Sequence, residues 1–495
     1  MFLRCGETRG TRLALLAGVL FFAGCDSAAS VVSCIERPDI CGSAGECDPE
    51  TRQCRRKSGA PCVSSEQCNL PERPVCNGAF CVPCDMLQTP EAADEACLSK
   101  NRKGVSACVR QGVKKGMCSE CRLDEQCGRD KPVCDTASSA CRACQKHSEC
   151  AKSGVCNLGG GLVDLPDVSL GTCVPSERVV FVDADHCPPS GSATGSRDKP
   201  FCEIVSALGK ADFVVAKPRT SGLYQGLRVS DGKRYAVVGN ERDSQTPVQL
   251  ASSSVSGAKT VLLLSDVTIR GDTVGAKCQS DGNLSLLRSV AQDALVGVDS
   301  TGCNKLVVEQ SVLSSNRTVG LRIGTGTRSF RLVNSLFIGN GQTAAGVGVF
   351  IASGTTGLFA FNTLLSNGEP GQDGGAVRCE TGGTVRRILL NSIVLQNGMS
   401  SRVDGSGQPL GTQFGGDCVL SHLVVGIDGT VVVPPSEALI RAIPDLDSNF
   451  RLLNTPNNRM YVIDKGVVSE SVWNDHFGSV RPKGDGYDIG VHELR

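Results

Sequence analysis

The chain has 495 residues, too many for one compact core, so we expect two or more domains. Its 51 basic and 51 acidic residues cancel, which gives no reason to expect a nucleic acid as a partner. It also contains 28 cysteines, and so many thiols are hard to maintain in a reducing cytosol. The composition therefore indicates an exported protein that folds under oxidising conditions.

Residues 1–24 are predicted to be a signal peptide. Three arginines precede the apolar run Leu13 to Phe22, which is too short for a bilayer-spanning helix of about 20 residues but typical of a secretory signal. The run ends in "FAGC", which resembles the lipobox of bacterial lipoproteins, although that family usually has Leu in place of Phe22. The resemblance implies that Cys25 becomes the lipidated first residue, with a membrane as its partner. Signal cleavage after Ala29 is the alternative.

A short linker, residues 25–33, leads into a cysteine-rich region over residues 34–173. Each module has about 20 to 35 residues, too few for a self-sufficient core, so two disulfides in each are expected to stabilise it. From the second module onward, neighbouring modules meet in a C-x2-C sequence. The cysteines form five groups of four: Cys34, Cys41, Cys47 and Cys54; Cys62, Cys68, Cys76 and Cys81; Cys84, Cys97, Cys108 and Cys118; Cys121, Cys127, Cys134 and Cys141; Cys144, Cys150, Cys156 and Cys173.

The C-x2-C pairs could instead be zinc ligands or a redox pair. However, the region has one histidine, His147, and no βαβ pattern, so we favour structural disulfides. Spacing alone cannot choose among the three pairings that four cysteines allow. The first module, "CIERPDICGSAGECDPETRQC", resembles the front half of an epidermal-growth-factor-like module, which implies first-to-third and second-to-fourth pairing. We expect a semi-rigid, loop-rich stalk.

From Val179 onward a phrase recurs, as in "RLVNSLFIGNG", "FAFNTLLSNGEP" and "RILLNSIVLQNGM". The intervals of 22 to 30 residues are too short for a propeller blade, and the segments show strand-like alternation. They suit one coil of a parallel β-helix, whose three strands pair with their equivalents one coil above and below. When the repeats are aligned, equivalent positions form a polar column and, two residues later, an apolar column. The polar column is Ser265, Arg288, Gln310, Asn334, Asn362, Asn391 and Ser421, and the apolar column is Val267, Val290, Val312, Leu336, Leu364, Ile393 and Leu423.

The fold predicted for residues 179–495 is thus mostly β, a right-handed parallel β-helix. The apolar column is expected to face the core. Three members of the polar column, Asn334, Asn362 and Asn391, are expected to lie at a turn and to hydrogen-bond along the stack. Longer coils must loop out extra residues, above all in Asn367 to Gly383, and such loops commonly carry binding or chemistry.

The ends of this region resemble those of pectin-lyase-like β-helix proteins. "DKPFCEIVSALGKA", from Asp198 to Ala211, resembles the amphipathic helix that caps the first coil of that family, and "RPKGDGYDIGVHE" resembles a closing segment. The resemblance extends from Val179 to Arg495. It implies the fold of this region but says little about its function.

Six further cysteines are expected to pair within the β-helix. Cys187 and Cys202 flank the entry loop, and Cys278 and Cys303 are about one coil apart, so stacking could bring the latter pair within bridging distance. Elimination leaves Cys379 with Cys418.

Proteins of the pectin-lyase-like class include polysaccharide lyases and hydrolases, so a groove with carboxylates and a basic residue is sought. The polygalacturonase-type signatures are absent, and "VWNDH", around Trp473, lies in the closing segment. The catalytic candidates are Asp373, Arg378 and Glu380 on the longest inserted loop.

Other charged residues could also form sites, but we favour the interpretation that all of them are solvated loop charges and turn formers. Arg317, Arg322 and Arg328 fall within one coil. The pairs Asp183 with Asp185, and Asp485 with Asp488, could supply oxygens to Ca²⁺; otherwise no metal or cofactor is expected. His476 and His492 are expected to help close the fold.

The sequence therefore favours a lipoprotein of the cell envelope, at the outer membrane or cell surface, whose β-helix recognises polysaccharide or protein without catalysis. The alternative is an extracellular polysaccharide lyase or hydrolase. A groove of converging carboxylates with Arg or Lys would favour the enzyme, and a face without them would favour recognition.

Overall fold

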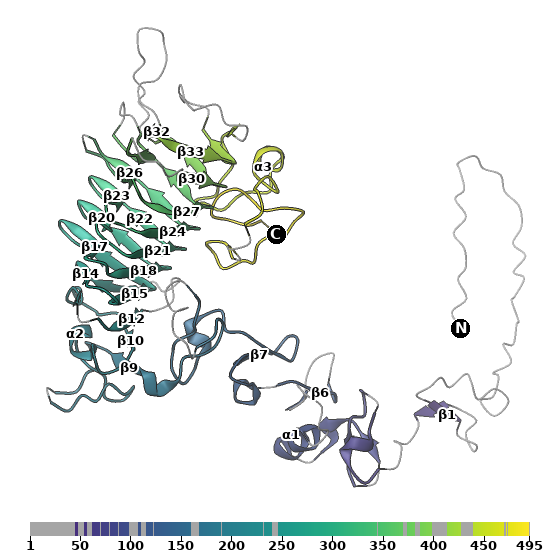
Figure 1. The fold of residues 1–495 in the computed structure, drawn as a ribbon. Coiled ribbons are helices and arrows are strands. Elements are labelled where there is room, and N and C mark those ends of the chain that lie inside the picture. The colour runs from purple at the N-terminus through teal and green to yellow at the C-terminus, as the bar shows by residue number, and fades with distance from the viewer. Residues whose placement is uncertain are drawn as a thin grey trace, which may run out of the picture. The chain divides into compact units, whose positions relative to one another are not determined.

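The computed structural model contains short strands, few helices and a long parallel β-solenoid (Figure 1). The described residues are 45–47, 54–56, 62–69, 71–78, 80–87, 89–98, 107–109, 115–121, 123–159, 168–189, 191–230, 232–239, 246–343, 345–369, 374–381, 387–397, 413–426, 439–469, 472 and 474–494. Cys25, Asp373 and Trp473 lie outside them, as do most of the first cysteine module and the proposed signal peptide.

The chain divides into two compact units. One comprises Met1–Lys103 with Cys108–Cys118, and the other comprises Gly104–Ala107 with Ser119–Arg495. Within the described residues, modules two and three therefore belong to the first unit. Modules four and five belong to the second unit together with the β-helix. From the sequence, all five modules were expected to form a region apart from the β-helix.

The first four cysteine modules each contain a two-stranded sheet, and module five contains one isolated antiparallel bridge between Cys156 and Cys173. In modules two to five the first cysteine bonds the third and the second bonds the fourth. This is the pairing that the growth-factor-like resemblance implied for module one, whose own disulfides lie outside the described residues. The elements here are β1 (Gly45–Cys47), β2 (Cys54–Arg56), η2 (Ser65–Gln67), β3 (Val75–Cys76), β4 (Cys81–Val82), η3 (Cys84–Met86), α1 (Pro90–Leu98), β5 (Ala107–Cys108), β6 (Cys118–Ser119), η4 (Asp124–Gln126), β7 (Val133–Asp135), β8 (Ala140–Arg142), η5 (His147–Glu149) and η7 (Ser176–Arg178).

The β-helix consists of three parallel sheets, which we call sheets I, II and III in the order that a coil visits them. Sheet I contains β9 (Val179–Val182), β10 (Phe213–Ala216), β12 (Arg234–Val238), β15 (Val261–Ser265), β18 (Asn283–Leu287), β21 (Lys305–Glu309), β24 (Ser329–Val333), β27 (Thr356–Ala360), β30 (Arg387–Leu390) and β33 (Cys418–Ser421). Sheet II contains β13 (Val248–Leu250), β16 (Val267–Arg270), β19 (Val290–Gln292), β22 (Val312–Ser314), β25 (Leu336–Ile338), β28 (Thr363–Leu365), β31 (Ile393–Leu395), β34 (Leu423–Val425) and β35 (Leu439–Arg441). Sheet III contains β11 (Arg228–Val229), β14 (Ser253–Ser256), β17 (Val274–Gln279), β20 (Val296–Asp299), β23 (Val319–Ile323), β26 (Val347–Ile351), β29 (Val377–Cys379) and β32 (Phe414–Gly416).

The core lies between the three sheets and is built from residues that stack coil on coil. In sheet II the inward column is Ile269, Ala291, Leu313, Phe337, Leu364, Val394 and Val425. The predicted apolar column was wrong at several coils. Val290 and Val312 are partly exposed on the outer surface, and Ile393 belongs to an outer cluster. The reason is that successive side chains in a strand point to opposite faces, so a shift of one residue exchanges inside for outside.

The asparagine ladder is formed by the second Asn of each phrase, not the first as predicted. Each side-chain amide donates to the carbonyl oxygen of its equivalent in the next coil, from Asn316 to Asn340 to Asn367 to Asn397, at 2.7 to 2.9 Å. All four side chains are fully buried. Each also donates to a backbone carbonyl of the strands around it. The ladder therefore satisfies buried amides that would otherwise destabilise the turn.

The first Asn of the phrase has other roles. Asn334 and Asn391 have positive φ, at 53° and 47°, and form the turn from sheet I to sheet II. Their amides donate to the backbone of the C-terminal segment, at Asn474 and Val467. Asn362 is instead aligned with buried serines, and its backbone N–H donates to Ser392 Oγ at 3.1 Å. The predicted column thus combined two adjacent columns.

The first coil is covered by a shorter helix than predicted. Only α2 (Ile204–Ala207) is helical within the predicted range from Asp198 to Ala211, although Ile204 is fully buried against the core as expected. At the other end, α3 (Pro456–Tyr461) belongs to a segment that folds back over the outside of the last coils (Figure 1). No described helix has the length and apolar character needed to cross a membrane.

Three disulfides join Cys187 with Cys202, Cys278 with Cys303 and Cys379 with Cys418. These are the three pairs expected from the sequence. The first links the entry loop to the segment before α2, and the other two each link neighbouring coils.

Candidate functional site

Module five covers one end of the outer face of sheet I. Its Val155, Val168 and Val174 pack in one apolar cluster with Phe213, Ala236, Val238, Leu263 and Leu287 from the first strands of that sheet. Burial of large apolar side chains in such a contact stabilises it by roughly 1.5–3 kcal/mol for each one fully buried. The sequence predicted a separate stalk that includes this module, without this contact.

A buried polar group lies within the same contact. His147 Nε2 lies 3.1 Å from Asp266 Oδ2 and 3.2 Å from Ser265 Oγ, while its Nδ1 accepts the backbone N–H of Cys156 at 3.1 Å. Nδ1 is therefore the acceptor and Nε2–H the donor. Arg288 binds the same carboxylate at 2.6 Å. Burial opposes ionisation of Asp266, but the hydrogen bond from His147 and the charge of Arg288 outweigh it and hold its pKa below the usual range.

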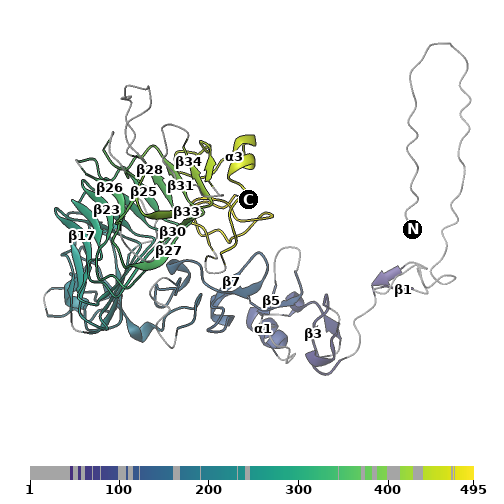
Figure 2. The same cartoon turned by 45° about the horizontal axis from the view of Figure 1, so that its top comes forward.

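The C-terminal segment covers the other end of sheet I and the last strands of sheet II. Val472 and Tyr487 pack with Val333, Ala360 and Phe361 around sheet I. A second cluster joins Ala442, Leu452, Val462 and Ile489 of the segment to Ile393, Leu395 and Val424 of sheet II. Within the segment, Arg481 and Glu493 form a fully buried ion pair at 2.8 Å. Figure 2 shows the yellow segment and α3 near β33 and β34.

The apolar cluster on the outer side of sheet III contains, among the described residues, none from module five or the C-terminal segment. That cluster is a column of four valines, Val274, Val296, Val319 and Val347, together with Phe350. Beside the valines runs a second outward column, in which a cation stands at every second position from Arg228 to Arg378. In register it reads Arg228, Ser254, Lys277, Asp299, Arg322, Phe350, Arg378 and Gly415. We call this second column the sheet III column.

Two hollows lie at the two ends of the sheet III column. One is lined by Phe350, Arg378, Glu380 and Gly415, and the other by Arg228 with Asp272 and Asp293. Of the three predicted catalytic candidates, Arg378 and Glu380 are thus brought to one hollow. Glu380 Oε2 accepts the backbone N–H of Ser353 at 2.8 Å, so part of this carboxylate holds the neighbouring coil.

The three arginines of one coil do not converge. Arg317 donates to the backbone oxygen of Asp272 at 2.9 Å, and Arg328 pairs with Asp281 at 2.8 Å. Only Arg322 belongs to the sheet III column, where it lies 3.6 Å from Asp299. Two carboxylates of this face, Asp272 and Asp293, do share a hollow with basic residues, and Asp293 lies 3.4 Å from Arg270.

The carboxylates considered for Ca²⁺ contact donors of the protein itself. Asp183 binds Lys217 at 3.0 Å and His186 at 3.1 Å, and Asp185 accepts the backbone N–H of Thr220. Asp488 accepts the backbone N–H groups of Asp464 and Leu494. Asp485 lies in the same segment and is exposed.

The two histidines of the C-terminal segment have structural contacts. His476 is buried, with Nδ1 2.7 Å from the backbone oxygen of Asn334. His492 accepts the backbone N–H of Leu452 through Nδ1 at 3.0 Å, and burial lowers its pKa. Both therefore help to close the fold.

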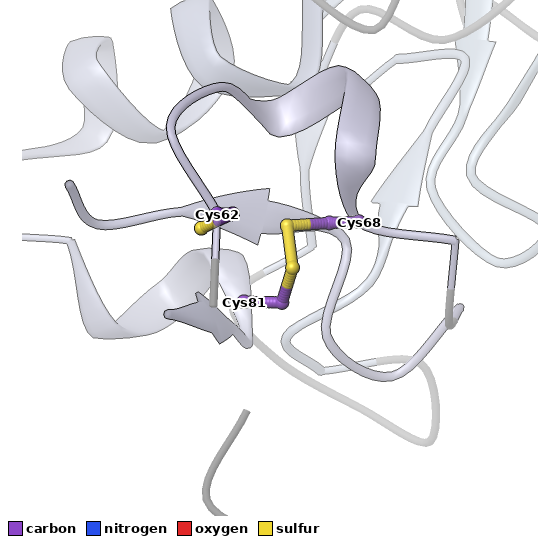
Figure 3. A group of neighbouring side chains, drawn as sticks. All are labelled: Cys62, Cys68 and Cys81. Carbon is purple, nitrogen blue, oxygen red and sulfur yellow. A yellow bond between two sulfur atoms is a disulfide. The ribbon is translucent and has the colours of Figure 1, made fainter. Parts of the chain in front are cut away.

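The groups close enough to hold a metal ion, within the described part of the chain, are trios of cysteines in modules two to five. Figure 3 shows Cys62, Cys68 and Cys81, with a disulfide between the last two. Cys62 is bonded to Cys76. The cysteines of each C-x2-C sequence also belong to different disulfides, as Cys81 and Cys84 do.

Comparison with known proteins adds no family to this description: no protein-family model matches the chain, and no curated protein matches it in sequence.

Proposed function

We propose that the protein is a recognition protein of the bacterial cell envelope, held by a lipid on Cys25, whose β-helix binds an extended polysaccharide across sheet III without cleaving it. The observation that carries this proposal is the uneven covering of the β-helix. Module five and the C-terminal segment cover parts of the outer face of sheet I and the last strands of sheet II, while sheet III displays aligned cations and one aromatic ring. Aligned cations attract polyanions, and aromatic rings can stack on sugars.

The proposal includes the lipid anchor on Cys25 and a relationship of the β-helix to pectin-lyase-like proteins. Lipidation would hold the chain at the outer membrane or cell surface, where an extracellular polymer is accessible. Labelling of cells with a radioactive fatty acid tests the anchor. We expect label in the native protein and none in a Cys25→Ser variant, with Cys5 left intact as the control cysteine.

The alternative is a polysaccharide lyase or hydrolase of the pectin-lyase-like class. The hollow that holds Arg378 and Glu380 favours it, because a basic residue beside a carboxylate is a common arrangement in such sites. The engagement of Glu380 with Ser353 favours recognition instead.

One experiment separates the two functions. The full chain is incubated with acidic and neutral polysaccharides, with and without Ca²⁺, while binding and new chain ends are measured together. Binding without new ends supports recognition. Cleavage that is lost in Asp373→Ala or Arg378→Ala establishes the enzyme. If Arg378→Ala changes neither binding nor cleavage, the site lies away from sheet III.

A further inference from the structure

The cations of the sheet III column occur at every second coil. The strand register places Arg228, Lys277, Arg322 and Arg378 at alternate positions, with Ser254, Asp299 and Phe350 between them. Neighbouring strands are about 4.8 Å apart, so successive cations repeat at roughly 10 Å. A parallel β-helix keeps this interval fixed, because each strand is hydrogen-bonded to both of its neighbours.

In an extended β-linked polysaccharide each sugar advances the chain by nearly the distance between two strands. Two coils therefore match two sugars. We propose that sheet III selects an acidic polysaccharide with one carboxylate in each disaccharide, lying along the β-helix axis. This inference rests on the proposed function and specifies the ligand class.

The residues between the cations suit uncharged sugars. Phe350 is partly exposed between Arg322 and Arg378 and packs on the valine column, which holds its ring against the face. A ring in that position can stack on the apolar face of a sugar. Ser254 offers a hydroxyl group at another of these positions.

Asp299 provides the selectivity. It lies between Lys277 and Arg322, and it would face a carboxylate if every sugar carried one. The repulsion between like charges disfavours such a polymer. Asp299 itself is buried. Its Oδ1 accepts two hydrogen bonds from Thr301 and its Oδ2 lies 3.6 Å from Arg322, so it acts on the polymer through its charge.

Affinity measurements on the full, oxidised chain test this inference at low and moderate salt. The probes are hyaluronan, with one carboxylate per disaccharide, polygalacturonate, with one per sugar, dextran as the neutral polymer and polyglutamate as an acidic peptide. We expect hyaluronan to bind at least ten-fold more tightly than polygalacturonate. Binding should strengthen with oligomer length until the oligomer reaches all four cations.

Variants assign the binding to this column. Lys277→Ala and Arg322→Ala should each weaken hyaluronan binding several-fold, whereas Arg459→Ala removes a cation from exposed α3 and should leave it unchanged. Asp299→Asn should strengthen polygalacturonate binding and so reduce the difference in affinity between hyaluronan and polygalacturonate. Thermal unfolding of each variant shows whether the fold is retained.

The outcomes distinguish this inference from the proposed function. Polygalacturonate binding as tightly as hyaluronan, with the same loss in Lys277→Ala, overturns the alternating-charge inference and leaves polysaccharide recognition intact. Binding of polyglutamate alone overturns the polysaccharide ligand in favour of an acidic protein. Binding of none of the four probes overturns both proposals.

Discussion

Modules two to five and the β-helix are held together by different interactions. In the modules, cysteine is the commonest buried residue, and each module is tied by two disulfides. In the β-helix every coil supports its neighbours through apolar columns and the asparagine ladder, with three disulfides added. A module can thus be ordered by itself, whereas a coil requires neighbouring coils.

Reduction of the disulfides should give the largest difference between these regions. Loss of a native disulfide from a small domain costs about 2–5 kcal/mol, and each module has two. We expect modules two and three to unfold in dithiothreitol while the strands from β15 to β25 remain protected. Hydrogen exchange followed by mass spectrometry measures both regions in one sample.

A Cys278→Ser/Cys303→Ser variant is the matched control, because it removes a disulfide from the β-helix alone. It should fold with its solenoid intact and lower stability. Modules that keep their protection after reduction would show that the comparison is wrong.

Within the β-helix, the asparagine ladder should be the most sensitive polar feature. Asn340→Ala removes the acceptor of Asn316 and the donor to Asn367, and it leaves buried groups unpaired. Each unpaired buried group costs roughly 1–3 kcal/mol, so we expect a loss of about 3 kcal/mol in urea unfolding.

Asn304→Ala is the control for this measurement. Asn304 also donates to an asparagine of the preceding coil, Asn283, at 2.8 Å, but this pair is only partly buried. Its loss should cost less than about 1 kcal/mol. Equal losses from the two substitutions would contradict the role given to burial.

The ladder also shows how far the sequence determined the fold. The recurring phrase predicted stacked parallel strands, and the structure confirms a mostly β parallel solenoid after a disulfide-rich region. It did not reveal which Asn faces inward, because this depends on the positive φ of the residue that turns the chain, such as Asn334 before Ser335 or Gly339 before Asn340. Spacing alone does not show where that turn lies.

The candidate site was only partly predictable for a related reason. Arg378 was selected because it lies near a long loop, but Lys277 and Phe350 gave no local signal. They join the same column only through pairing between coils whose lengths differ, so the register must be known first. His147 likewise could not be linked to Ser265 and its neighbour Asp266, because Ser265 lies 118 residues away along the chain.

A smaller effect should show that module five belongs with the β-helix. His147→Ala removes the hydrogen bonds to Cys156 and Asp266 and leaves a gap in the buried contact. We expect a loss of roughly 2 kcal/mol, together with faster hydrogen exchange in residues 144–159. His186→Ala, on an 81% exposed side chain, should change stability by less than about 0.5 kcal/mol. Unchanged hydrogen exchange in module five would show that the His147 contact does not hold this module on the β-helix.

The smallest expected effect is a difference in acid sensitivity between the two segments that cover the β-helix. Burial lowers the pKa of His492, so the unfolded chain binds this proton more readily than the folded chain does. The stabilisation is therefore present above the ordinary histidine pKa of about 6.5 and is lost as the pH falls. Asp266 also has a lowered pKa, but its contribution is lost only below about pH 4, the ordinary aspartate range.

Between pH 7.5 and 5, hydrogen exchange should consequently rise a few-fold in residues 474–494 and stay constant in residues 144–159, after correction for the intrinsic rate. Burial raises the pKa of Asp488, which favours the C-terminal segment in acid and acts against the His492 effect. The His492→Gln variant isolates the histidine, because its amide oxygen can still accept the N–H of Leu452 but does not titrate. If hydrogen exchange rises by the same amount in this variant, the acid sensitivity belongs to other groups. If exchange rises only in module five, module five and not the C-terminal segment is the more acid-sensitive of the two.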